Sequence, residues 1–339
     1  MTRSDSNGVQ PVLDEGRSTT TYVQLEQAVE RALAAPSVHN TQPWRWRIGS
    51  DRIELHADRD RHLAGTDPEG RDLVISCGAA LHHLRVALAG AGFASCTVRT
   101  PDPEDRHHLA TVQVVDGPPD PGDTALFGQL TRRRTDRRGY VGPSVSQPTV
   151  DQLVRAATVR GAMLRPVTDP ARRQQLLAVL EDAAARQPHT PGYLAELMTW
   201  THRYADAKDG VPRQAVPRSW PTDARHLQRF PAGTLRSDVG LDPGAGMLFA
   251  LCTREDDETA QLIAGEAASA VLLTATRAGL ASAPMSQAVE LATTRDRLRR
   301  QVLGVPEYPQ LVIRVGRSPA GSAALPPTPR RSIRSVLLR

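Results

Sequence analysis

Lysine is almost absent from this sequence: Lys208 is the only one, although the 339-residue chain carries 42 basic residues against 37 acidic ones. A single lysine leaves no basis for a Walker phosphate-binding loop or a Schiff-base mechanism. The arginines are spread among acidic residues, and no basic run contains interleaved aromatic residues. This pattern is typical of a solvated surface, so the net charge of +5 does not predict nucleic-acid binding.

Cysteine is rare as well. Cys77, Cys96 and Cys252 are an odd number, and no two of them have the C-x-x-C spacing of zinc or redox sites. The simplest interpretation is buried thiols in a reducing compartment.

Long apolar runs and metal-binding motifs are also missing. No 18 consecutive residues are apolar, and the N-terminus is polar where a signal peptide needs an apolar stretch. We therefore expect a cytoplasmic chain that contacts no membrane. The adjacent histidine pairs at 82–83 and 107–108 cannot share one helix face, and no carboxylate or cysteine joins them at ligand spacing. We expect no metal.

What the sequence does contain is an internal repeat. Residues 78–95 read GAALHHLRVALAGAGFAS and residues 265–282 read GEAASAVLLTATRAGLAS, with six identities at a constant offset. Each copy predicts a long apolar helix that ends at a glycine and is followed by a short extended segment. The repeat predicts an α+β chain of two similar halves, each a mixed, mainly antiparallel sheet flanked by helices.

The remaining periodicity fits around these two helices. Apolar spacing predicts a helix over 22–35, alternation predicts paired strands within 44–57, and the proline-rich stretch 117–123 predicts a join. We expect a flexible tail at 1–20, a first half at 21–120 and a second half at 121–339 with a lid-like insertion at about 190–240. In the second half we expect a helix ending in RRRTDRR, helices near 151–157, 170–186, 193–207 and 294–303, and strands at 163–167, 247–252 and 309–316.

Two polar clusters are candidates for chemistry. Residues 35–46, APSVHNTQPWRW, place several polar side chains between a helix end and a strand, where side chains can converge. Arginines at 132–138 surround Thr135, and a second basic group, TPRR, follows at 328–331. Two such groups could bind one phosphate dianion. A capped helix end and a solvated charged surface remain the ordinary alternatives.

The same segments carry a family resemblance. APSVHNTQPW resembles the A-P-S-x-x-N-x-Q-P-W segment of the nitroreductase family, and RRTDR at 133–137 resembles its phosphate motif R-[RH]-[ST]-x-[KR]. GLASAPMS at 279–286 looks like the flavin-edge segment, and TPRR looks like the C-terminal basic contact. With a lid-like segment in one chain, the combination resembles the Acg-type branch, in which a single polypeptide imitates the usual homodimer. The resemblance covers roughly residues 22–335.

The resemblance implies an FMN site at the junction of the two halves. Ser286 would be the catalytic position, because its backbone N–H would lie at flavin N5, where a hydride arrives. The implied cofactor contacts are Pro36, Ser37, Asn40, Gln42, Arg45, Arg133, Thr135, Arg137, Pro284, Met285, Ser286, Arg330 and Arg331.

Only one such site is expected per chain. The first half has no arginine motif before its first helix, and the second half has AATVRGAMLRPV where the polar loop would stand. The arginines of one half and the polar loop of the other make one complete site, so we expect one FMN per chain in a monomer with an internal pseudo-two-fold axis.

The implied activity is NAD(P)H-dependent two-electron reduction of a small conjugated acceptor, a nitroaromatic or a quinone. Two alternatives remain open. One is an FMN storage or sequestration protein whose lid permits little turnover, and the other is a flavin enzyme that oxidises a cellular metabolite.

Overall fold

The computed structural model describes residues 21–102, 104–141, 145–201, 203–204, 206–219, 228–236 and 246–338. The tail expected at 1–20 and parts of the expected lid lie outside the described residues.

The first half is built on a four-stranded antiparallel sheet of order β1-β2-β4-β3. Its elements are α1 (Tyr22–Ala32), β1 (Trp44–Ile48), β2 (Arg52–Ala57), α2 (Arg71–Gly90), β3 (Ala94–Arg99), β4 (His108–Val115) and α3 (Pro121–Thr124), with short 3₁₀ turns at Val38–Asn40, Arg59–Arg61 and Phe127–Gln129.

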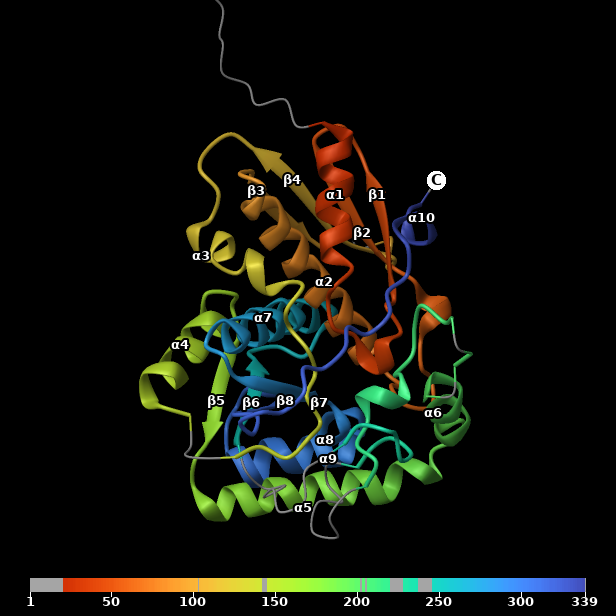
Figure 1. Cartoon of the computed structure of the whole chain (residues 1–339), viewed down its shortest axis with the longest axis vertical. Coiled ribbons are helices and arrows are strands. Elements are labelled where there is room, and N and C mark those ends of the chain that lie inside the picture. The colour runs from red at the N-terminus through yellow and green to blue at the C-terminus, as the bar shows by residue number, and fades with distance from the viewer. Residues whose placement is uncertain are drawn as a thin grey trace, which may run out of the picture.

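The second half repeats this plan on an antiparallel sheet of order β5-β6-β8-β7. Its elements are α4 (Gln147–Thr158), β5 (Met163–Val167), α5 (Pro170–Arg186), α6 (Tyr193–Thr201), β6 (Met247–Thr253), α7 (Glu258–Arg277), β7 (Ala281–Met285), α8 (Gln287–Glu290), α9 (Ala292–Arg297), a π-helix (Leu298–Leu303), β8 (Tyr308–Gly316) and α10 (Ile333–Val336), with 3₁₀ turns at Gln187–His189 and Arg213–Ala215. The matching strand orders confirm the α+β class with two similar halves, and Figure 1 shows one half above the other.

The additional elements of the second half are insertions into the shared plan. The chain between β5 and β6 holds α5, α6 and the lid-like segment, whereas β1 and β2 are joined by a tight turn. α8, α9 and the π-helix occupy the connection from β7 to β8.

Local sequence explains where the helices begin. Thr21 accepts a hydrogen bond from the Gln24 backbone N–H, and the Gln24 side chain accepts one from the Thr21 backbone, which together form a capping box for α1. Asp257 caps α7 in the same way through the Ala260 N–H. Two predictions of length were wrong: α1 ends at Ala32 and α6 at Thr201, short of 35 and 207.

The predicted helix ending in RRRTDRR is also wrong. Between β4 and residue 130 the described chain forms only the short helix α3 and a 3₁₀ turn, and the arginines then follow in irregular backbone. Asp120 caps the short helix at Pro121, but the sequence does not continue the apolar 3.6-residue period that a longer helix needs.

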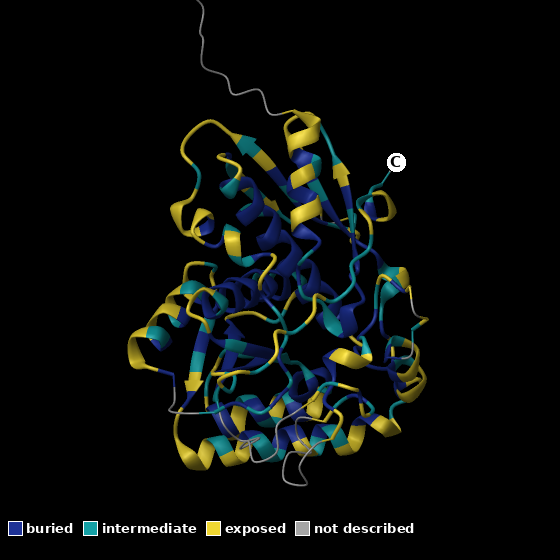
Figure 2. Ribbon diagram, in the orientation of Figure 1, coloured by how far each residue is buried: buried dark blue, intermediate teal, exposed yellow. Residues whose placement is uncertain are grey.

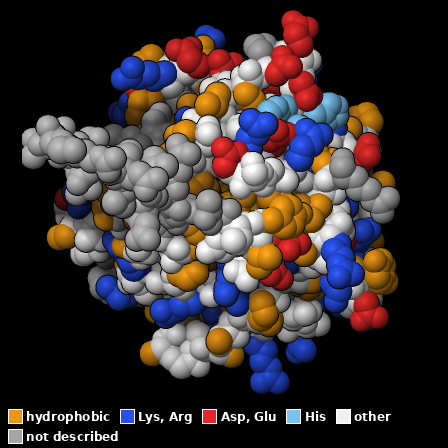
Figure 3. Space-filling model, turned by 90° about the horizontal axis from the view of Figure 1, so that it is seen from above, with side chains coloured by type: hydrophobic (Ala, Val, Ile, Leu, Met, Phe, Trp, Pro, Cys, Tyr) orange, Lys and Arg blue, Asp and Glu red, His pale blue; other side chains and the backbone are white. Residues whose placement is uncertain are grey.

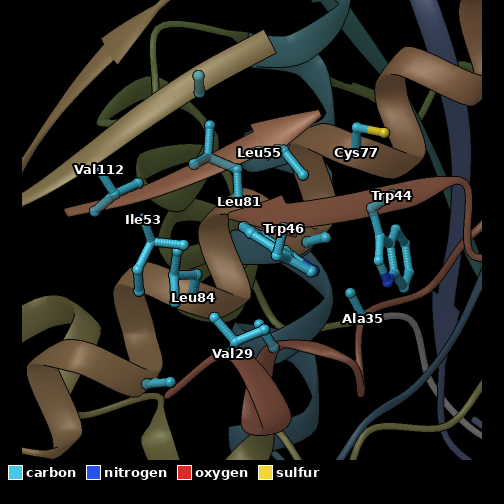
Figure 4. Packing of buried hydrophobic residues seen from close by; sticks show 14 of the residues in the cluster. Val29, Ala35, Trp44, Trp46, Ile53, Leu55, Cys77, Leu81, Leu84 and Val112 are labelled. Atoms are coloured by element: carbon cyan, nitrogen blue, oxygen red, sulfur yellow. The ribbon is translucent and has the colours of Figure 1, made fainter. Parts of the chain in front are cut away.

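The core of the first half lies between its sheet and two helices. Trp44 and Trp46 of β1 are fully buried and point to the same side as Leu55 of the neighbouring strand. Figure 4 shows Val29 of α1 and Leu81 of α2 close to these residues, so the sheet side and the helix side interlock. The predicted alternation over 44–57 therefore marks a real buried sheet face.

Helices α2 and α7 pack against each other between the halves. α2 is long and apolar enough to cross a membrane by length and composition, but 89% of that stretch is buried inside the protein. Figure 2 shows it dark blue along most of its length. Gly78 and Gly265 face each other where the helices meet, and neither position has room for a side chain. α2 is thus the central core helix of the fold.

The C-terminal arm returns to the first half. After β8 the chain runs back to β1, where the Leu338 N–H donates to the Trp46 carbonyl at 2.7 Å and α10 lies beside α1. Figure 1 shows this blue segment alongside β1. The TPRR segment lies on this return path, which carries it to the polar loop of the first half.

The glycine contact gives a stability prediction. A Cβ at Gly78 would lie 2.1 Å from the Leu262 carbonyl oxygen and 2.9 Å from the Gly265 Cα. Gly→Ala within a helix normally stabilises by up to about 1 kcal/mol. Here we expect Gly78→Ala to lower the free energy of unfolding by about 2 kcal/mol or more, because the two backbones must separate.

The measurement is urea unfolding followed by circular dichroism, with Gly128→Ala as the control, since a Cβ there meets nothing within 4 Å. A Gly78→Ala protein as stable as the control would contradict the tight helix contact.

Candidate functional site

A cavity with about 1430 Å³ of space between its walls, its mouth included, lies where the two halves meet. The first half contributes the loop after α1 and the start of α2, and the second half contributes α7, the end of β7 and the irregular segment around residue 230. The predicted site residues in its wall are Pro36, Ser37, Asn40, Arg133, Thr135, Arg137, Pro284, Met285, Ser286 and Arg330. Segments almost 300 residues apart in sequence therefore share one cavity.

Three of the predicted contacts lie behind the wall instead. Arg45 and Arg331 both pair with Asp58, at 3.0 and 3.2 Å. The Arg331 backbone N–H donates to Gln42 Oε1 at 2.8 Å. Gln42, Arg45 and Arg331 do not line the cavity and instead fix the C-terminal arm against the loop.

The loop after α1 is held in an unusual backbone conformation. His39, Asn40 and Gln42 have φ values of 45°, 56° and 52°, in the left-handed region that non-glycine residues seldom adopt. Each such residue costs on the order of 1 kcal/mol, so the surrounding contacts must hold the loop in place.

The Asn40 side chain provides much of that hold. Its Nδ2 donates to the carbonyls of Gly210, at 3.0 Å, and Pro329, at 3.1 Å, and its Oδ1 accepts from Arg330 Nη1 at 3.0 Å. Both donor hydrogens and one acceptor position are thus used within the protein. Asn40 joins three segments: the loop, the lid-like segment and the C-terminal arm.

The cavity concentrates positive charge at Arg133. This side chain is 4% exposed, and its Nε and Nη1 atoms are buried with no hydrogen-bond partner among the described residues. Burial, together with the guanidiniums of Arg330, Arg134 and Arg137, lowers the pKa of Arg133 to about 9. A buried cation without a counter-charge is unfavourable, so this end of the cavity is complementary to an anion.

Burial acts on the neighbouring arginines in the same direction. It lowers the pKa of Arg137 and of Arg330, each to about 10. Arg330 uses its Nη2 to donate to the carbonyls of Ala34 and Ala35, both at 3.1 Å, and so also caps the end of α1. Of this cluster, Arg133 has the guanidinium most available to a ligand.

Sequence reasoning missed a buried acid in the opposite wall. Asp72 is 4% exposed, lines the cavity, and has a buried Oδ2 with no partner among the described residues. Burial, with the nearby carboxylates of Glu290 and Asp67, raises the pKa of Asp72 well above its usual range. An aspartate with a raised pKa keeps its proton to a higher pH than an exposed one does. Asp72 escaped notice because an acid in the first turn of a helix is ordinary.

Arg229 was missed as well, since the irregular segment around it carries no motif. Its Nη1 donates to Glu290 Oε1 at 2.6 Å and to Ser286 Oγ at 3.1 Å, and its Nη2 donates to Glu290 Oε2 at 2.9 Å. Ser286 Oγ also donates to Glu290 Oε1 at 2.6 Å. This bidentate pair connects the lid-like segment to the end of β7.

The lid-like segment closes over the polar loop. Phe230 packs edge-on against His39 with ring centroids 5.1 Å apart, and the Arg137 guanidinium lies 4.9 Å from the Phe230 ring. Gln42 Nε2 donates to the Lys208 carbonyl at 2.9 Å. His39 is buried with both ring nitrogens unpartnered in the described part of the chain, and burial lowers its pKa well below the usual range. His39 is thus a neutral group in the cavity wall.

No family model matches the chain. It is 44% identical over 311 residues to "Putative NAD(P)H nitroreductase Rv3131" of Mycobacterium tuberculosis H37Rv, which spans 90% of this chain and 88% of that protein. It is 34% identical over 322 residues to "Putative NAD(P)H nitroreductase acg" of the same organism, spanning 92% and 94%. The FMN-dependent nitroreductase NfnB of Mycobacterium smegmatis, solved in complex with NADPH, is 17% identical with a TM-score of 0.40, covering 62% of this chain and 96% of that one.

The unpartnered cation gives a prediction for the ligand-free protein. Arg133→Met keeps the volume and removes the buried charge, so we expect the free energy of unfolding to rise by about 1–3 kcal/mol. Arg132→Met alters the adjacent, exposed arginine and serves as the control. It should change the free energy of unfolding by less than about 0.5 kcal/mol. Urea unfolding of dialysed, ligand-free protein measures both. A ligand-free Arg133→Met protein less stable than the parent would contradict the account of a strained cation.

Proposed function

The chain belongs to the nitroreductase family of NAD(P)H-dependent enzymes, and we propose that it binds one FMN and transfers two electrons from NAD(P)H to a small conjugated acceptor, a nitroaromatic or a quinone. The observation that carries the proposal is the buried Arg133 guanidinium at one end of a cavity lined from both halves, where its Nε and Nη1 have no partner among the described residues. We place the reaction in the cytoplasm, in a monomer whose two halves complete the site.

The residues present fit FMN. Arg133, supported by Arg137 and Arg330, would hold the phosphate, since guanidinium groups bind phosphate oxygens in pairs. Ser37 and the backbone around Ser286 would contact the flavin ring from opposite walls. When bound, FMN supplies a carrier that accepts a hydride from nicotinamide and passes two electrons to the acceptor.

The chain itself would supply protons. Reduction of a nitro group or a quinone consumes protons as well as electrons, and a covered cavity restricts their delivery from water. Asp72 lines the cavity, burial raises its pKa, and its Oδ2 has no partner among the described residues. We infer that the Asp72 carboxyl group donates a proton to the reduced acceptor. Arg229 would hold the neighbouring Glu290 carboxylate in place as an ion pair.

A second candidate function is FMN storage with little turnover. The observation that favours it is the closure of the lid-like segment, which is bonded to Asn40, Gln42 and Glu290 and packs against His39. Closed in this way, the segment would keep nicotinamide from the ring.

No other class of partner is favoured. Figure 3 shows basic and acidic side chains interspersed on the face that it draws, without a continuous basic patch. The partner that the proposal requires is a small molecule.

The phosphate assignment predicts a difference between two arginines. Arg133→Met should weaken FMN binding about tenfold to a hundredfold, because a charge-assisted hydrogen bond contributes about 1.5–3 kcal/mol. Arg331→Met should weaken it far less, because Arg331 pairs with Asp58 outside the cavity. Quenching of FMN fluorescence on titration measures both. Equal affinities for Arg133→Met and the parent would refute the phosphate assignment.

The lid decides between the two functions. We expect stopped-flow mixing of the FMN-loaded protein with NADH or NADPH to bleach the flavin within seconds, whereas storage predicts bleaching by dithionite only. The double variant Arg229→Met/Glu290→Gln removes both charges of the ion pair that connects the lid-like segment to the end of β7, and it should accelerate bleaching. A rate unchanged in the double variant would show that the segment does not limit access.

A further inference from the structure

Three potential metal ligands gather on the outer face of the first sheet, away from the cavity. Side chains alternate between the two faces of a strand, and Ile53 and Leu55 of β2 point into the core. Glu54 and His56 therefore lie together on the opposite face. His108, the first residue of β4, is directly opposite His56 in the strand register.

This grouping was not accessible from sequence spacing. The separation of 52 positions between His56 and His108 has no meaning until the sheet pairs β2 with β4. A β-bulge between Leu55 and His56 shifts the register locally, and it is this shift that brings the two histidines opposite each other.

The distances are close to those of a coordination sphere. His56 Nε2 lies 3.2 Å from Glu54 Oε2, and the ligand atoms of the three residues all lie within 4.8 Å of one another. Bonds of about 2.0–2.1 Å in a tetrahedral zinc site place two ligand atoms roughly 3.4 Å apart. The Glu54–His56 edge already matches, and the remaining edges need to close by at most about 1.4 Å.

The two imidazoles lie side by side, and both rings must tilt before their nitrogens can bind one cation. Their ring centroids are 4.6 Å apart and their planes differ by 14°. Each ring makes a hydrogen bond that a metal would replace or share: His56 Nε2 with Glu54 Oε2 at 3.2 Å, and His108 Nε2 with Thr111 Oγ1 of β4 at 2.9 Å.

One contact competes with a metal. Arg47 Nη1 donates to Glu54 Oε2 at 2.7 Å, but the Arg47 side chain is 53% exposed and such surface pairs contribute about 1 kcal/mol or less. The other carboxylate oxygen, Glu54 Oε1, has no hydrogen bond within the described chain. The alternative is that these residues form only a hydrogen-bonded surface network.

We propose that Glu54, His56 and His108 bind one divalent transition-metal cation of the zinc class, with water completing the coordination. Two imidazole nitrogens and a carboxylate oxygen suit Zn²⁺, Ni²⁺ and Cu²⁺, whereas Mg²⁺ requires more oxygen ligands. The cation joins β2 to β4 at the bulge and adds a cross-strand connection that is independent of the cavity.

The test is calorimetric titration of the full chain with ZnCl₂, with MgCl₂ as the cation control. We expect one Zn²⁺ per chain and no Mg²⁺ binding. His108→Asn and Glu54→Gln should each weaken Zn²⁺ binding at least tenfold, whereas His107→Asn, which alters the adjacent exposed histidine outside the cluster, should not change it.

Copper supplies a second readout that does not depend on stability. The electron paramagnetic resonance spectrum of one equivalent of Cu²⁺ should show coupling to two imidazole nitrogens in the parent and to fewer in His108→Asn. Zn²⁺ binding that is absent in the parent, or equal in the parent and His108→Asn, would overturn the proposal.

Discussion

The close contact of α2 with α7 is the constraint on which the rest of the structure depends. Gly78 and Gly265 let the two helix backbones approach without side chains between them. Beside this contact, Ser269 Oγ lies 2.7 Å from His82 Nδ1 and 2.8 Å from His83 Nδ1, so a buried polar seam fixes the register of the helices. Because each helix carries its own sheet, one contact sets the relation of the two halves and therefore the shape of the cavity.

The cavity wall contains buried charged and polar groups that are energetically unfavourable in the ligand-free chain. Among the described residues, Arg133 is buried with no partner for its Nε and Nη1, and Asp72 is buried with a raised pKa and no partner for its Oδ2. His39 has a left-handed backbone conformation, and its ring nitrogens have no partner there either. Each of these features costs free energy in the ligand-free chain. Their concentration in one cavity is the strongest physical sign of a binding site.

Much of the fold could be predicted from the sequence because its signals are local. The repeat helix has a strong apolar pattern, and the strands of 44–57 alternate clearly, so both halves were recognisable. Helix ends were less predictable, since caps and tertiary contacts decide them. The site was predictable only in part: motifs marked Arg133 and Ser37, but no pattern distinguishes Arg330 in the wall from Arg331 behind it.

The residues that sequence could not reveal act through the tertiary structure. Asp72 resembles an ordinary helix-start acid, Arg229 lies in irregular chain, and His56 meets His108 only through a bulged strand register.

The central claim, that two halves of one chain build a single flavin site, is tested most directly by native mass spectrometry of the FMN-saturated protein. The account predicts a species with the mass of one chain and one FMN. Two FMN bound to a single chain, or FMN retained only by a pair of chains, would contradict it.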